Sequence, residues 1–167
     1  MIALLVASIL AAQAGVLAPL EQRVAVLLFV RTDCPISNRY APEIQRIEQR
    51  FYKQGVTFRL VYPEAGVTDE SIERHRREYG YTIPGIADPK HRYVAKAGVE
   101  VTPEAAVFVR GRLVYRGRID DQYVSFGQAR AKPSVHDLED ALAAVIAGRA
   151  PRASGTKAIG CAIEPLR

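Results

Sequence analysis

The chain has 167 residues, 49% of them hydrophobic and 25% charged, which is typical of a globular protein and excludes a disordered one. This length suits a single domain that buries its own core without structural metals or many disulfides. The formal net charge of +5 permits weak attraction to anionic surfaces, but the basic residues are mostly scattered, so we predict no nucleic-acid partner.

The first fourteen residues predict a signal peptide, 1–14. An uncharged run at 2–12, apolar except for Ser8, leads into Ala12-Gln13-Ala14, the small-x-small pattern of a signal peptidase site. The run is shorter than the roughly 20 apolar residues that span a bilayer. We expect cleavage after Ala14, a periplasmic or extracellular location, and no stable membrane insertion afterwards. A retained N-terminal helix is the alternative.

Apolar patterning predicts alternating strands and helices. The run at 24–30 (VAVLLFV) is continuously apolar and β-branched, as in a strand covered on both faces. A polar segment at 31–38 follows it. In chain order we then predict a helix ended by Gly55, a strand at 56–62, a helix capped by Thr68 that stops at Gly80, a short helix closed by Gly98, a hairpin at 105–109 and 113–118, and a helix ended by Gly148.

Two of these helices are placed by their capping signals. Asp88-Pro89 suits an N-cap followed by proline at the first helical position. Ser134 is predicted to cap the last helix, whose apolar stripe consists of Val135, Leu138, Leu142 and Val145.

The order of the elements predicts the fold class. A strand–helix–strand unit requires parallel strands, whereas the hairpin requires antiparallel ones. We therefore predict an α/β protein, a three-layer sandwich with a mixed central β-sheet flanked by helices. The domain would cover 15–148, and 149–167 would form a flexible tail that carries Cys161.

Cys34 is the strongest candidate for reactive chemistry. It precedes a predicted helix, where unpaired backbone N–H groups and the positive end of the helix dipole stabilise a thiolate. Arg31 and Arg39 add positive potential, while Asp33 opposes it. We predict a pKa below the ordinary value for this thiol.

The buried strand that ends in Thr32-Asp33-Cys34-Pro35-Ile36-Ser37, followed by a helix, resembles the thioredoxin-like superfamily. The segments DCPISNRYAPE and YRGRIDDQY and the terminal GC resemble bacterial redoxin-domain proteins of the AhpC/TSA-like type. The resemblance implies a cis peptide bond before Pro103, and a substrate site formed by Pro35, Thr102 and Pro103. There the backbone of Thr102 would pair with an extended substrate.

One position departs from the dithiol pattern of that superfamily. Ser37 stands where the second cysteine of a thioredoxin lies, and it could donate a hydrogen bond to the Cys34 thiolate. Three outcomes stay open: Cys34 acts as a monothiol, Cys161 is a distant partner, or the redox function is lost. A bridge of Cys34 to Cys161 requires Cα atoms within about 7 Å, and it could also be purely structural.

Other candidate groups have weaker support. Glu104 is either a proton acceptor or, as we favour, a solvent-facing carboxylate. His75, His91 and His136 lie on separate predicted helices without metal-ligand spacing, and we expect His75 and His136 at the surface. We predict no metal site and no cofactor.

Two related chemistries fit the motif less well. Peroxiredoxins carry P-x-x-x-T-x-x-C, and here Leu27 and Arg31 occupy the proline and threonine positions, although Arg116 or Arg118 could supply the arginine that family uses. Copper chaperones of this type use C-x-x-x-C plus histidine, and here Asn38 replaces the second cysteine.

The sequence therefore predicts an exported thiol–disulfide oxidoreductase. Its nucleophile would be Cys34, its possible resolving cysteine Cys161, and its partner a protein disulfide substrate or redox partner. The alternatives are a non-enzymatic thioredoxin-fold module that binds a peptide or copper, and a peroxiredoxin-like peroxidase.

Overall fold

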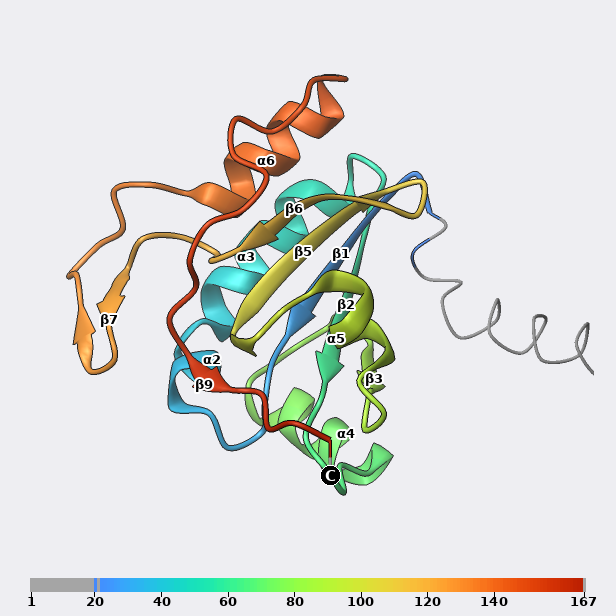
Figure 1. Ribbon diagram of the computed structural model, residues 1–167, viewed down its shortest axis with the longest axis vertical. Coiled ribbons are helices and arrows are strands. Elements are labelled where there is room, and N and C mark those ends of the chain that lie inside the picture. The colour runs from blue at the N-terminus through green and yellow to red at the C-terminus, as the bar shows by residue number, and fades with distance from the viewer. Residues whose placement is uncertain (1–19, 21, 167) are drawn as a thin grey trace, which may run out of the picture.

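A strand that is apolar on both faces needs cover on both sides, and β1 (Val24–Phe29) obtains it as the middle strand of a five-stranded sheet (Figure 1). β1 pairs in parallel with β2 (Val56–Tyr62), which pairs in parallel with β3 (Gly85–Ala87). On its other side β1 pairs antiparallel with β5 (Glu104–Val109), which forms a hairpin with β6 (Arg112–Gly117). The sheet is therefore mixed, as the sequence predicts.

This computed structural model describes residues 20 and 22–166. The predicted signal peptide, 1–14, lies outside the described residues. Within the part of the chain that the structure describes, no helix has the length and apolar character needed to cross a bilayer.

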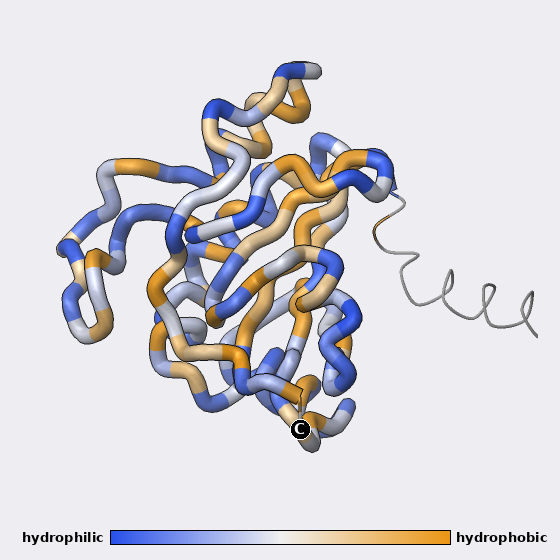
Figure 2. Tube along the Cα trace, viewed as in Figure 1, coloured by the Kyte–Doolittle hydropathy of each residue, from blue (hydrophilic) through white to orange (hydrophobic). Residues whose placement is uncertain are grey.

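Helices cover both faces of the sheet. The β1 side chains Val24, Val26 and Leu28 lie in one core cluster with buried residues of α3 (Ala41–Tyr52) and α6 (Asp137–Ile146). Ala25, Leu27 and Phe29, on the opposite face, lie in a second cluster with residues of α5. In Figure 2 the central strands are mostly orange and the outer loops mostly blue. The helices are α2 (Pro35–Arg39), α3 (Ala41–Tyr52), α4 (Asp69–Glu78), α5 (Arg92–Ala97) and α6 (Asp137–Ile146).

The predicted three-layer α/β sandwich is thus confirmed. The hairpin turns at Arg110 and Gly111, whose positive φ values of 48° and 77° suit a tight two-residue turn. Among the described residues, four short strands lie outside the main sheet: β4 (Val101–Thr102) pairs with β9 (Cys161–Ala162), and β7 (Tyr123–Ser125) pairs with β8 (Gln128–Ala129).

Two predicted helix starts are wrong. Asp88 does accept hydrogen bonds from three backbone N–H groups, those of Arg92, Tyr93 and Val94, but it lies four positions before the first residue of the helix. Pro89 therefore lies in the loop and not at the first helical position. The chain turns into α5 at His91, which has a φ of 51°.

Ser134 does not cap α6. Its hydroxyl donates to Asp121 Oδ2 at 2.6 Å, so it belongs to a loop that Asp121 organises. The helix begins at Asp137 with His136 as its N-cap, and Val135 is 41% exposed and not part of the buried stripe. A capping residue and a loop residue look alike in sequence because both use the same hydroxyl chemistry.

The C-terminal tail is hydrogen-bonded to the domain. Ser154 and Thr156 bond to the backbone of Arg116 at 3.0 and 3.1 Å, which lays the tail beside β6. A Cβ atom on Gly117 would lie 2.3–2.7 Å from atoms of Thr156, so only glycine allows this crossing. The tail then runs down to β9 (Figure 1). Flexibility of this segment stays a prediction, and it would require these contacts to break.

Candidate active site

Cys34 lies just beyond the carboxyl end of β1 and is the N-cap of α2. Pro35 occupies the first turn of that helix, where its missing N–H costs nothing. The backbone N–H of Ser37 points at Cys34 Sγ, 3.5 Å away, and the Cys34 side chain is 1% exposed. In the reduced protein we expect the same N–H group to stabilise a thiolate.

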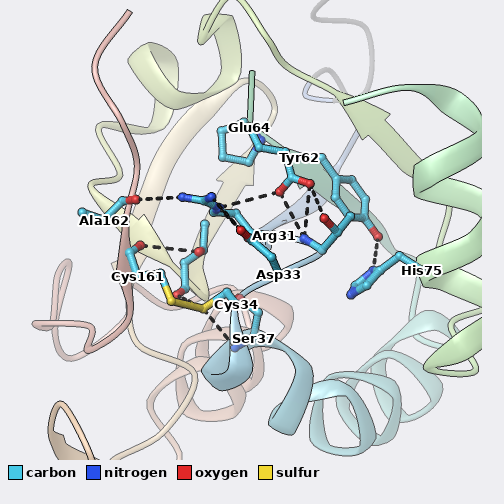
Figure 3. A network of polar contacts seen from close by, with 12 residues as sticks. Arg31, Asp33, Cys34, Ser37, Tyr62, Glu64, His75, Cys161 and Ala162 are labelled. Atoms are coloured by element: carbon cyan, nitrogen blue, oxygen red, sulfur yellow. Dashed lines mark hydrogen bonds and ion pairs between the residues drawn. A yellow bond between two sulfur atoms is a disulfide. The ribbon is translucent and has the colours of Figure 1, made fainter. Parts of the chain in front are cut away.

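The partner of Cys34 is Cys161, 127 positions along the chain (Figure 3). The two residues form a disulfide with their Cα atoms 6.2 Å apart, a usual separation for such a bond. Of the three outcomes left open by the sequence, the structure therefore contains the one in which the tail cysteine reaches the helix entrance.

The loop before β5 completes this site. The Thr102–Pro103 peptide bond is cis, as the family resemblance implies. The carbonyl oxygen of Thr102 lies 3.2 Å from Cys34 Sγ, and the backbone of Thr102 pairs with that of Cys161. Thr102 thus contacts both cysteines. A substrate-binding role for Thr102, Pro103 and the exposed Pro35 stays a prediction.

Ser37 is buried beside the disulfide. Its side chain is 1% exposed, and its hydroxyl oxygen has no hydrogen-bond partner. The buried hydroxyl has already lost its hydrogen bonds to water. A thiolate formed at Cys34 on reduction could therefore accept a hydrogen bond from it at little further desolvation cost. This fits the predicted hydrogen bond to the Cys34 thiolate.

The positive charge of Arg31 is balanced by nearby carboxylates, which the sequence does not indicate in full. Its Nε lies 3.0 Å from Asp33 Oδ1 and 3.8 Å from Glu64 Oε2 (Figure 3). Glu64 also accepts a 2.6 Å hydrogen bond from the hydroxyl of Thr32. Arg31 Nη1 donates to the carbonyl oxygen of Ala162 at 3.4 Å, so this guanidinium holds the tail strand as well.

Comparison with known proteins shows the family to which this chain belongs. The model of the AhpC/TSA family matches residues 12–118. The chain belongs to the AhpC/TSA family. No protein with a curated description matches the sequence.

Solved structures similar to this AhpC/TSA family member show its fold. An uncharacterised conserved protein from Geobacillus kaustophilus is 23% identical, with 90% of this chain and 82% of that chain covered and a TM-score of 0.78. A hypothetical protein from Sinorhizobium meliloti is 22% identical over 90% and 84%, with a TM-score of 0.76. A secreted disulfide oxidoreductase from Mycobacterium tuberculosis is 18% identical over 78% and 85%, with a TM-score of 0.51.

Glu104 is not the solvent-facing carboxylate that the sequence analysis favours. It is 5% exposed, and its Oε2 accepts hydrogen bonds from the backbone N–H groups of Glu100 and Val101 at 2.9 and 3.4 Å. Burial raises its pKa, while these N–H groups and Arg116, 3.7 Å away, act in the opposite direction. Glu104 therefore stabilises the loop that leads to Pro103 through these hydrogen bonds.

His75 is likewise not at the surface. It is 3% exposed and links three elements, because its Nδ1 lies 2.9 Å from the Tyr62 hydroxyl and its Nε2 lies 2.9 Å from Asn38 Oδ1. Asn38 in turn donates to the carbonyl oxygen of Thr32. Burial lowers the pKa of His75. The residues next to His75 in sequence are charged, but they lie on the other faces of α4. They therefore do not indicate the environment of His75 itself.

The cysteines of this AhpC/TSA family member do not belong to a cluster of metal ligands. Among the described residues, one group of His, Cys, Asp and Glu side chains is close enough to share an ion: Glu43, Asp120 and His136. Asp120 accepts a hydrogen bond from the Tyr40 hydroxyl at 2.5 Å, and burial raises the pKa of Asp120. Arg46 pairs with both oxygens of Glu43.

Proposed function

We propose that this protein is a thiol–disulfide oxidoreductase that acts on protein disulfides, with Cys34 as the nucleophile and Cys161 as the resolving cysteine. One observation carries the proposal: Cys34 is bonded to Cys161 at the entrance to α2, directly beside the cis-Pro103 loop. The fold shared with a secreted disulfide oxidoreductase supports it.

The proposed reaction has two exchange steps. The Cys34 thiolate attacks one sulfur of the partner's disulfide, so a mixed disulfide forms and the second partner sulfur leaves as a thiolate. The Cys161 thiolate then attacks Cys34 Sγ, which releases the partner as a dithiol and forms the bridge seen here. Both steps are reversible, and the relative reduction potentials set the direction.

The fold separates the roles of the two cysteines. Cys34 is held between the central strand and α2, whereas Cys161 lies on β9, a strand of two residues. Short peripheral pairing opens at a lower free-energy cost than core structure. Once the bridge is reduced, the tail can therefore leave Cys34 while Cys34 keeps its place.

A structural bridge is the second candidate, and one observation favours it. Cys34 is 1% exposed in the bridged form, so attack at its sulfur requires the surrounding structure to open. In that case the disulfide would simply pin the tail to the domain, and the protein would be a binding module.

The pH dependence of alkylation separates these candidates. In the Cys161→Ser variant we expect a Cys34 thiolate with a pKa well below the free value of about 8.5. Incubation of that variant with an oxidised protein should give a mixed disulfide that mass spectrometry maps to Cys34, and Cys34→Ser is the matched control. A normal pKa, or a wild-type bridge that resists strong reductant in the folded state, would favour the structural role.

Peroxide reduction has less support than disulfide exchange. Arg31 stands where peroxiredoxins have their threonine, and its guanidinium is engaged by Asp33, Glu64 and the Ala162 carbonyl oxygen.

We also propose export to the periplasm or the extracellular space. The apolar run at 2–12 supports this location, and so does the disulfide, because disulfides persist most readily in oxidising compartments. N-terminal sequencing of the secreted fraction should begin at Gly15, and a retained Met1 in the cytoplasm would contradict the proposal.

A further inference from the structure

The backbone edge beside Cys34 is occupied by the chain's own tail. In the antiparallel pairing of β4 and β9, Thr102 lies opposite Cys161 and Val101 lies opposite Ala162. The N–H of Ile163 continues the ladder by donating to the carbonyl oxygen of Glu100 at 2.9 Å. Residues 161–163 therefore pair with β4 as an extended segment, which follows a bend at Gly160 and carries a cysteine that is disulfide-bonded to Cys34.

This arrangement is also what a partner protein would adopt in a mixed disulfide with Cys34. Backbone pairing is independent of side chains, so an extended partner segment can make the same hydrogen bonds to β4. The tail and a partner cannot occupy β4 together. The contacts of the tail side chains then indicate which partner segments the edge accepts.

The position before the tail cysteine has no room for a side chain. A Cβ atom on Gly160 would lie 2.2 Å from the carbonyl oxygen and 2.6 Å from the carbonyl carbon of Thr102. These are backbone atoms next to the cis peptide bond, and they cannot rotate away as a flexible side chain would. Any larger residue would have to push the strand off β4 or move the loop.

The second position after the tail cysteine is apolar. Ile163 is half-buried and packs against the core cluster that contains Phe29 and Tyr93, whereas Cys161 packs against the cluster on the other face of the sheet. A pocket of about 620 Å³ adjoins it, lined in part by Arg31, Pro63, His91 and Leu166. Between the two positions, Ala162 is exposed, and its backbone oxygen accepts from Arg31.

We propose that residues 160–163 act as an internal substrate and reveal the recognition rule for partners. Cys34 accepts a cysteine in an extended segment that has glycine immediately before it and a large apolar residue two positions after it. This inference rests on the proposed function and names its substrate class. The residue directly after the cysteine is free to vary.

Three peptides test the rule on the full chain carrying Cys161→Ser. The reference peptide has the tail's own sequence from Ala158 to Glu164, with its cysteine linked to 2-nitro-5-thiobenzoate as a disulfide. A second peptide has alanine in place of the glycine, and a third has serine in place of the isoleucine. Attack by the Cys34 thiolate joins the peptide sulfur to Cys34 Sγ and releases the coloured thiolate, which reports the rate.

We expect the alanine peptide to react about tenfold or more slowly than the reference, and the serine peptide about three- to tenfold more slowly. Glutathione, used as nucleophile on the same peptides, corrects for their intrinsic reactivity. Equal corrected rates for all three peptides would overturn the recognition rule and leave the proposed function standing. A Cys34 that reacts with neither the peptides nor iodoacetamide would overturn the proposed function and the rule with it.

Discussion

Thr102 and Cys161 lie opposite each other in an antiparallel pair of two-residue strands, and the Thr102 carbonyl oxygen is also 3.2 Å from Cys34 Sγ. A single residue before the cis-proline thus contacts both ends of the disulfide. The proposed exchange chemistry should therefore be coupled to tail docking, because we expect whatever loosens the tail strand to uncover Cys34.

Gly160→Ala should loosen the bridge. The new Cβ would meet the backbone of Thr102, so β9 should lift and the Cys34–Cys161 disulfide should be reduced by dithiothreitol about three- to tenfold faster. Gly155→Ala is the matched control in the same tail, since its Cβ would lie at an ordinary 3.4 Å from the carbonyl oxygen of Arg116. Thiol titration over time measures both rates, and equal rates would contradict the close approach.

Ser37→Ala should raise the pKa of the Cys34 thiol. The Ser37 hydroxyl has no partner in the bridged form, and we expect it to donate to the thiolate once the bridge is reduced. The pH profile of alkylation, measured in a Cys161→Ser background, should move to higher pH. In the oxidised protein Ser37→Ala should either raise the unfolding free energy or change it by less than about 1 kcal/mol relative to the wild type, because a buried unpaired hydroxyl is removed.

His75 should make stability fall in mild acid. Its neutral ring accepts from Tyr62 through Nδ1 and donates to Asn38 through Nε2, so the folded state resists protonation, and burial lowers its pKa. The unfolded chain takes up the proton below about pH 6.5, so this stabilisation is complete above that value and is lost as the pH falls towards the folded pKa.

His75→Gln should therefore weaken the pH dependence of the unfolding free energy between about pH 5 and 7. It should also cost about 1–3 kcal/mol at neutral pH, through the disturbed buried hydrogen bonds. Urea unfolding at a series of pH values measures both effects. His136→Gln is the control, since that side chain is 45% exposed, and an identical change in both variants would refute the role of His75.

Glu104→Ala should destabilise the loop before Pro103. It removes the acceptor for the N–H groups of Glu100 and Val101, and their loss should cost about 1–3 kcal/mol of unfolding free energy. Glu104→Gln keeps an amide oxygen in place and should recover most of this loss. If alanine and glutamine are equally destabilising, charge pairing with Arg116 matters more than the backbone hydrogen bonds.

Local features of the sequence identified the fold and one half of the site. The unbroken apolar run of β1 identifies a buried strand, and Thr68 caps α4 as predicted. Cys34 could be placed at a helix entrance because Pro35 and the following spacing are local signals. Polar character alone places His75 and Glu104 at the surface, although His75 lies three residues after the buried Ile72 and so shares its face of α4.

The sequence by itself determined the α/β sandwich and the position of Cys34, because strand and helix periods and helix starts depend on residues close together in the chain. Only the tertiary structure decided that Cys161 reaches Cys34, that its strand lies along Thr102, and that Gly160 must be glycine. These facts depend on where a tail folds after 127 positions of chain. That path depends on the crossing at Gly117 and the backbone edge of β4, both far from the cysteines in sequence, and on the packing of Ile163 against the core.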